Sequence, residues 1–229
     1  QAEDGIRDVA VTGVQTVCSS DLPLDMDTIC RTVEAGLDRL IPEGQLDVMG
    51  FSFGGHAATS AAAHVGPRLR NLVLAASRFV SGYKRVYPQL ITWKAIADPQ
   101  QRLAAHRVNL ARIMMAREAN IDALAVHLQA LNAAKARFFG PKLNPGTKLL
   151  DCLPAVRVRG RITAISGTED QGAQGIIDKH GEALRRLQPG ARFHAFDDAG
   201  HWVQYEARLE EHTSELQSRL HLVCRLLLE

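Results

Sequence analysis

The stretch LDVMGFSFGG at residues 46–55 decides the fold of this chain. A short apolar run leads into a serine flanked by glycines, and an alanine-rich segment, residues 56–64, follows. We predict a strand over 46–50, a sharp turn at Ser52 and a helix over 54–64, which together form a nucleophile elbow. Glycine is expected at Gly50 and Gly54 because a Cβ there would collide with the strand or helix entering the turn. The turn would lift the Ser52 hydroxyl to where a base and a substrate can reach it.

The same letters also fit a glycine–serine loop that merely precedes a helix. Three fixed positions of this kind recur by chance about once in 3,000 windows. The flanking strand and helix favour the elbow, but Ser52 alone does not decide between the two interpretations.

Two further polar residues follow two further predicted strands, in an order that supports the elbow. Residues 161–166 form one apolar strand and lead into SGTED, which ends at Asp170. Residues 191–196 form another strand and lead into DDAGHW, which contains His201. The chain order Ser52, Asp170, His201 is the order Ser…Asp…His of a hydrolytic triad. His201 would take the Ser52 proton as general base, and Asp170 would fix its tautomer and stabilise the imidazolium.

Each member of this set has a plainer alternative. An aspartate after a strand is often a turn former or helix cap, and a lone histidine is often structural or exposed. Glu169 is the second choice for the acid, whereas Asp197 and Asp198 are poorer candidates because they lie on the histidine loop itself. The agreement of three loops in order and spacing favours the triad.

The motifs GFSFGG, SGTED and DAGHW resemble those of α/β-hydrolase-fold enzymes. The resemblance implies an α/β fold class: a partial α/β-hydrolase fold, with a mostly parallel sheet, helices on both faces and a helical lid insertion. It also implies that the first strands of the family's sheet are missing, together with a loop that supplies one of two oxyanion amides. The amide of Phe53, just after the nucleophile, would be the remaining oxyanion donor.

Apolar periodicity divides the rest of the chain into core and lid. A helix is predicted over 28–40, a parallel strand over 71–76 and a helix over 175–188. Between about 79 and 150 the pattern is helical, with the longest helices predicted over 100–117 and 121–138. This insertion resembles the family's lid.

Both ends of the chain resemble translated sequencing adapters. Residues 1–8 back-translate as CAA GCA GAA GAC GGC ATA CGA GAT, and residues 210–218 and 221–229 give a complementary adapter. The alternative is that the tails are real helices, since leucines of the C-terminal tail have helix-like spacing. We expect adapter-like, non-native tails at 1–22 and 210–229, core at 23–78, a helical lid at 79–150, and the remaining core at 151–209.

The lid and the residue after His201 bear on the substrate. LQALN at 128–132, followed by Ala136-Arg137, resembles lid sequence of carbon–carbon bond hydrolases that cleave ring-fission products. In those enzymes a lid arginine can bind the substrate carboxylate, so Arg137 is a substrate-binding candidate, with Trp202 and Phe51. The alternatives are a solvated helix-end charge for Arg137 and a core aromatic for Trp202.

Charge and hydropathy argue against a nucleic-acid-binding or membrane-spanning protein. The formal net charge is +2, and both tails are acidic, so the central part is mildly basic. Its charges are scattered without an aromatic-interleaved stripe, which gives no support to nucleic-acid binding. No apolar run approaches the ~18 residues of a membrane span. We expect no metal, no cofactor, no membrane partner and a small-molecule substrate. The oligomeric state stays open, and a homo-oligomer is compatible with the sequence.

Two function classes follow. The first is a serine hydrolase acting on a small acyl or ester substrate, or on a C–C bond of a diketo acid. The second is a catalytically incompetent fragment or a non-enzymatic binding member of the same fold.

Cys30 and Cys152 lie far apart without a C-x-x-C spacing, which fits a reduced compartment and favours the cytoplasm.

Overall fold

The computed structural model describes residues 25–80, 88–136 and 146–207. The described helices and strands are, in chain order, α2 (Met26–Leu40), β1 (Leu46–Phe51), α3 (Gly54–Val65), β2 (Leu69–Ala75), α4 (Pro99–Ile113), α5 (Ala123–Lys135), α6 (Lys148–Cys152), β3 (Ile162–Gly167), α7 (Ile177–Leu187), β4 (Arg192–Phe196) and α8 (Val203–Glu206). Short 3₁₀ turns lie at Gly66–Arg68, Trp93–Ala95, Glu118–Asn120 and Leu153–Ala155. The predicted strands and helices of the core are confirmed to within two residues at each end.

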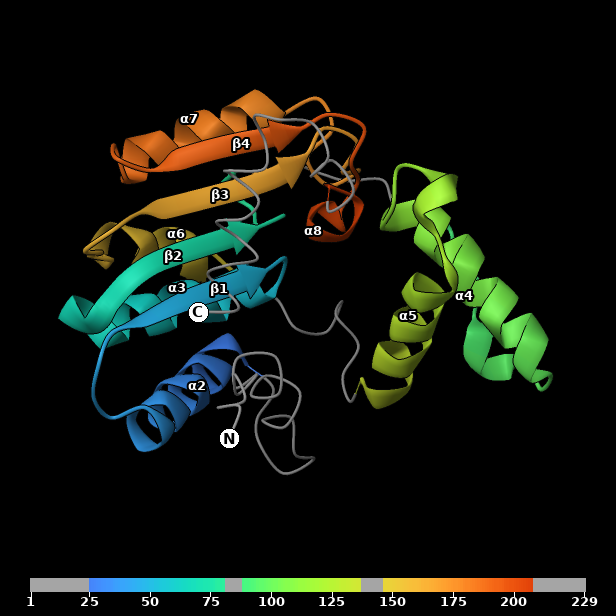
Figure 1. Ribbon diagram of the computed structural model, residues 1–229, viewed down its shortest axis with the longest axis horizontal. Helices are drawn as coiled ribbons and strands as arrows, with labels where there is room; N and C mark the ends of the chain where they lie inside the picture. Colours follow the sequence, from blue (N-terminus) through green and yellow to red (C-terminus); the bar gives the residue numbers. More distant parts are fainter. Residues whose placement is uncertain (1–24, 81–87, 137–145, 208–229) are drawn as a thin grey trace, which may run out of the picture.

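The four described strands form one parallel sheet in the order β1-β2-β3-β4 (Figure 1). Val73 in β2 is opposite Met49 on one side and Thr163 on the other. Since parallel strands all end at the same edge of the sheet, the loops after β1, β3 and β4 come together there. The α/β fold class is confirmed, and Ser52, Asp170 and His201 follow those three strands.

Side chains alternate between two apolar faces of this sheet, as expected for strands with a period of two. On one face Leu72, Leu74 and Ala164 pack against α3, α6 and α7. On the other face Ala75 and Ile165 pack against α8 and its neighbours. Helices α3, α6 and α7 thus cover one face, with α3 visible behind β1 and β2 in Figure 1, and the short helix α8 packs at the carboxyl end of the other face.

The pair of helices α4 and α5 stands apart from the sheet, beyond its carboxyl edge (Figure 1). Each begins at an aspartate whose side chain accepts from a helix amide: Asp98 from Gln101 N, and Asp122 from Ala125 N. Helix α4 ends at Ile113, earlier than the predicted residue 117, because the backbone amides at 116 and 117 pair with the Glu206 carboxylate instead. Helix α5 begins two residues later than predicted because Asp122 is its cap.

The proposed division into core and lid at residue 150 remains a prediction. Leu149 of α6, on the lid side of that division, is fully buried in the cluster formed by α3 and the sheet. The adapter-like tails lie outside the described residues. Within the described ranges, none of the helices has both the length and the apolar character needed to cross a membrane.

Candidate active site

The turn after β1 has the strained geometry of the predicted elbow. Ser52 is a non-glycine residue with φ of +51°, a left-handed conformation that is uncommon for such residues. Its amide donates to Ala75 O of β2 at 2.8 Å, which fixes the turn to the neighbouring strand. The Ser52 backbone therefore belongs neither to β1 nor to α3, and it forms a sharp turn between them.

Close packing around this turn requires glycine at two positions, Gly50 and Gly55, whereas the sequence predicted Gly50 and Gly54. A Cβ built on Gly50 would lie 2.6 Å from Ala58 Cβ and 2.7 Å from Gly55 Cα, so that prediction is confirmed. A Cβ on Gly54 would meet no atom of the described residues within 4 Å, so the prediction for Gly54 is wrong. The second close approach is at Gly55, where a Cβ would overlap the Ser77 hydroxyl. The sequence signal for this position is the glycine pair Gly54-Gly55, whose second member is the crowded one.

Ser52, His201 and Asp170 form a continuous hydrogen-bonded chain. His201 Nε2 lies 2.8 Å from Ser52 Oγ, and His201 Nδ1 lies 2.8 Å from Asp170 Oδ2. An ionised carboxylate only accepts hydrogen bonds, so Nδ1 carries the proton and Nε2 is free to accept one from the serine hydroxyl. The structure brings together the three residues that the sequence singled out.

Asp170 is fixed by burial and by hydrogen bonds, unlike the exposed acidic residues near it. Asp170 is buried, and its second oxygen, Oδ1, accepts from Gly172 N at 2.7 Å. The acid loop is also bound to the histidine loop, since Thr168 N donates to Phe196 O at 2.9 Å and Glu169 N to Ala199 O at 3.0 Å. The other acid candidates are placed differently. Side chains of Glu169, Asp197 and Asp198 are exposed, and Asp198 pairs with Arg117 at 2.6 Å.

The aromatic candidates lie in three different settings. The Phe51 ring centroid lies 5.1 Å from that of His201, so Phe51 packs on the imidazole. Phe53, the predicted oxyanion donor, is the first residue before α3 and has a helical backbone. Trp202 packs beside Tyr205 in the apolar cluster of α4 and α5. Arg137 lies outside the described residues.

A pocket of about 190 Å³ opens where the end of α4 meets the histidine loop. Of the three hydrogen-bonded residues, His201 lines it. The other lining residues come from the end of α4, from the acid loop and from the residue before the histidine: Ala111, Arg112, Ile113, Met114, Met115, Ala116, Glu169, Gln171, Gln174 and Gly200. Its walls are mostly polar, and Gln171 Nε2 donates to Arg112 O at 2.6 Å across it.

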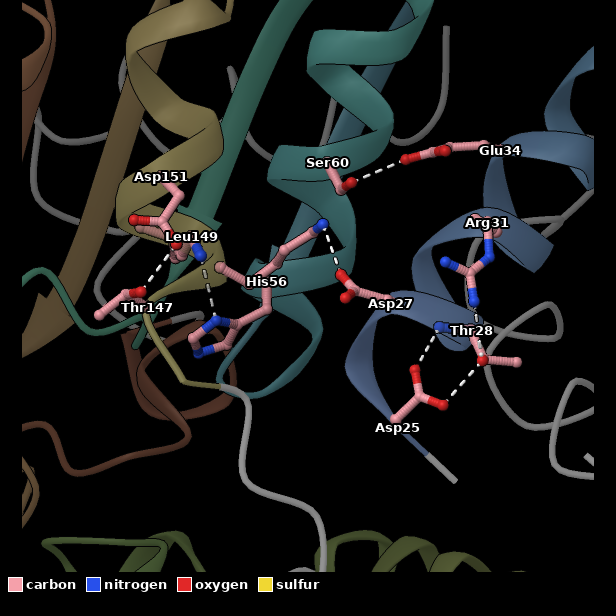
Figure 2. Close-up of polar contacts among 11 residues, drawn as sticks. Asp25, Asp27, Thr28, Arg31, Glu34, His56, Ser60, Thr147, Leu149 and Asp151 are labelled. Carbon is pink, nitrogen blue, oxygen red and sulfur yellow. Dashed lines mark hydrogen bonds and ion pairs between the residues drawn. The ribbon is translucent and has the colours of Figure 1, made fainter. Parts of the chain in front are cut away.

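A second histidine, His56, follows Ser52 closely in the sequence and lies in a buried setting. Figure 2 shows His56 of α3 directed at the start of α6, where its Nδ1 accepts from Leu149 N at 3.3 Å. Burial, with a smaller contribution from the Arg78 charge, lowers the pKa of His56 to about 4, so its ring is neutral at physiological pH. His56 thus joins α3 to α6 through this hydrogen bond.

No group of three or more histidine, cysteine, aspartate or glutamate side chains within the described ranges is arranged to hold a metal ion. The expectation of a metal-free and cofactor-free site stays a prediction.

Comparisons with known proteins give the following matches. The model of the alpha/beta hydrolase family matches residues 12–211. Among solved structures, a meta-cleavage product hydrolase from Pseudomonas fluorescens IP01 is 17% identical, with a TM-score of 0.59 over 91% of this chain and 74% of that one. A bromoperoxidase from Bacillus anthracis is 16% identical, with a TM-score of 0.55 over 91% and 77%. A thermophilic esterase from Thermogutta terrifontis is 17% identical, with a TM-score of 0.52 over 88% and 73%. No curated protein matches. At these identities the solved structures share the fold alone.

Proposed function

This chain belongs to the alpha/beta hydrolase family, and we propose that it is a serine hydrolase in which Ser52 is the nucleophile, His201 the base and Asp170 the orienting acid. The observation that carries the proposal is the hydrogen-bonded chain from Ser52 Oγ through the His201 ring to Asp170 Oδ2, with both contacts at 2.8 Å. Nucleophile, base and orienting group within hydrogen-bond reach are the geometric requirement for nucleophilic catalysis.

In the proposed mechanism, Ser52 Oγ attacks the substrate carbonyl while its proton passes to His201 Nε2. Asp170 stabilises the resulting imidazolium through Nδ1. The oxyanion forms beside the start of α3, where the Phe53 amide and the helix dipole favour negative charge. His201 then returns the proton to the leaving group, and a water activated by the same imidazole hydrolyses the acyl-enzyme. The pocket that reaches His201 supplies a polar path for that water.

We propose a small acyl or ester substrate, or the C–C bond of a diketo acid. Both chemistries are represented among proteins of the same fold, by the esterase and by the meta-cleavage product hydrolase. Fold similarity does not choose between them. The C–C branch rests on Arg137 as a carboxylate-binding residue and on Trp202 beside the histidine. Its substrate would be a small molecule, and a homo-oligomer is compatible with the proposal. The free thiols of Cys30 and Cys152 favour the cytoplasm.

The competing proposal is a catalytically silent member of the fold, which binds a ligand without turning it over. It is favoured by the sequence of residues 23–49, in which we recognise no second oxyanion loop. Removing one oxyanion donor costs roughly 10²–10³ in rate in other hydrolases, so a low but measurable activity would still support the first proposal.

Hydrolysis of p-nitrophenyl acetate and of a dienoic diketo acid tests these alternatives on the full chain. Turnover of the ester without turnover of the diketo acid would remove the C–C branch. Ser52→Ala should abolish either activity. Ser60→Ala is the matched control, because Ser60 is a buried serine of α3, the helix that follows the elbow, and its hydroxyl donates to Glu34 at 2.7 Å (Figure 2). A folded chain that turns over neither substrate and does not react with a fluorophosphonate would support the silent member.

A further inference from the structure

A buried carboxylate lies five residues beyond His201, at the end of α8. The Glu206 side chain is 4% exposed, and its two oxygens face donors from two distant parts of the chain. Oε2 accepts from Gly200 N at 2.6 Å, on the histidine loop. Ala116 N and Arg117 N, on the segment after α4, donate at 3.0–3.1 Å, and Asn120 Nδ2 donates at 3.3 Å. A carboxylate in such a place is costly unless its lone pairs are satisfied, and here donors surround it.

The two segments that Glu206 joins also touch each other directly. Trp202 N donates to Met114 O at 2.8 Å. Gly200 lies so close to the segment after α4 that a Cβ would come within 2.8 Å of Ala116 N and 2.9 Å of Met114 O. We call this contact, residues 114–120 against residues 200–206, the lid seam. In Figure 1, α8 lies between the carboxyl edge of the sheet and the α4–α5 pair.

The lid seam is adjacent to the reacting groups. Gly200 immediately precedes His201, so the hydrogen bond from Gly200 N to Glu206 fixes the Ala199–Gly200 peptide plane, one residue before the histidine. Residues 114–116, Gly200 and His201 all line the pocket that opens beside the triad. One carboxylate therefore binds both the backbone just before His201 and the segment after α4 that lines the pocket.

We propose that Glu206 is a positioning residue, which holds His201 in register with Ser52 by binding the histidine loop to the segment after α4. The catalytic part of this inference rests on the proposed serine hydrolase function. Glu206 touches no reacting atom, and its effect passes through Gly200. Because a misplacement of about 1 Å can cost about 10²-fold in rate, release of this loop should slow the chemistry while the chain stays folded.

Glu206→Gln is the informative variant. The amide keeps the shape of the side chain, but its NH₂ group would face backbone N–H donors. The amides on one side, either Gly200 N or those of Ala116 and Arg117, would then lose their acceptor. The matched control is Tyr205→Phe. Tyr205 Oη donates to Asp122 at 2.5 Å, so this change loosens the contact of α8 with α5 without touching Gly200.

Three readouts on the full chain test the proposal: the rate of fluorophosphonate labelling, hydrogen exchange at the Gly200 amide, and the NMR signals of the His201 ring. In Glu206→Gln we expect labelling to slow about 10- to 100-fold, Gly200 exchange to accelerate about tenfold or more, and the ring signals to broaden or split. In Tyr205→Phe we expect all three to stay within about threefold of the unaltered chain. If Glu206→Gln does not fold, Glu206→Asp keeps the charge but is one methylene too short to reach both segments, and should show the same changes in smaller degree.

Equal labelling and equal Gly200 exchange in Glu206→Gln and the unaltered chain would overturn the proposal. Equal losses in Glu206→Gln and Tyr205→Phe would overturn it too, because they would mark a general stability effect. If the unaltered chain is not labelled at all, the hydrolase proposal fails. Gly200 exchange and the His201 ring signals then still decide whether Glu206 fixes the histidine loop.

Discussion

Gly50→Ala should displace the nucleophile, whereas the same change at Gly54 should be harmless. A methyl on Gly50 would lie 2.6 Å from Ala58 Cβ, 2.7 Å from Gly55 Cα and 2.8 Å from Gly54 O. Non-bonded carbons prefer about 3.5–4.0 Å, so the elbow or α3 must move by about 1 Å. Two of the three obstructing atoms are backbone, and a side-chain rotation cannot relieve them. Overpacking of this kind costs about 1–3 kcal/mol.

Gly54→Ala is the matched control on the same turn. A methyl there meets no described atom within 4 Å, and alanine replaces glycine at the start of a helix, which stabilises by up to about 1 kcal/mol. The free energies of unfolding of the two variants should therefore differ by about 1–4 kcal/mol. Urea denaturation measures that difference. Fluorophosphonate labelling of the folded fraction should slow about 100-fold in Gly50→Ala alone. The reasoning is refuted if Gly50→Ala is as stable and as reactive as Gly54→Ala.

Two further changes test the acid and the buried histidine. Asp170→Asn should leave the fold intact but favour the wrong His201 tautomer, which lowers reactivity towards ester or fluorophosphonate by about 10³–10⁴-fold; a loss below tenfold would contradict the role of Asp170. For His56, the folded pKa of about 4 lies below its ordinary 6.5, so the unfolded chain binds the proton more readily. Its contribution to stability is full above about pH 6.5 and is lost as the pH falls towards 4, by up to about 3 kcal/mol. Urea midpoints should fall less between pH 7.5 and pH 4.5 in His56→Gln than in the unaltered chain, and identical slopes would contradict the assignment.

Local sequence was sufficient to predict the elements around Ser52 and the loops that carry Asp170 and His201. The strand, turn and helix around Ser52 follow from an apolar run, spaced glycines and alanine-rich sequence, and each is present as expected. Asp170 and His201 could be named because each follows a strand of the same parallel sheet, whose ends converge. Their mutual distances were not in the sequence, since they depend on the register of β1 to β4.

What the sequence did not predict depends on contacts between distant segments. Gly55 rather than Gly54 is the crowded glycine because Ser77, after β2, packs against it. The early end of α4 and the role proposed for Glu206 have the same origin: the carboxylate and its donors on the segment after α4 are more than 80 residues apart. A glutamate near a short helix carries no local signal that its oxygens face amides of another segment.

The most direct measurement of the central claim is the location of a fluorophosphonate adduct, mapped by peptide mass spectrometry on the native chain. We predict one adduct, on Ser52, which disappears in His201→Ala and after denaturation because the hydroxyl is then no longer activated by the imidazole. A folded chain without an adduct, an adduct on another residue, or unchanged labelling of Ser52 in His201→Ala would contradict the proposed triad.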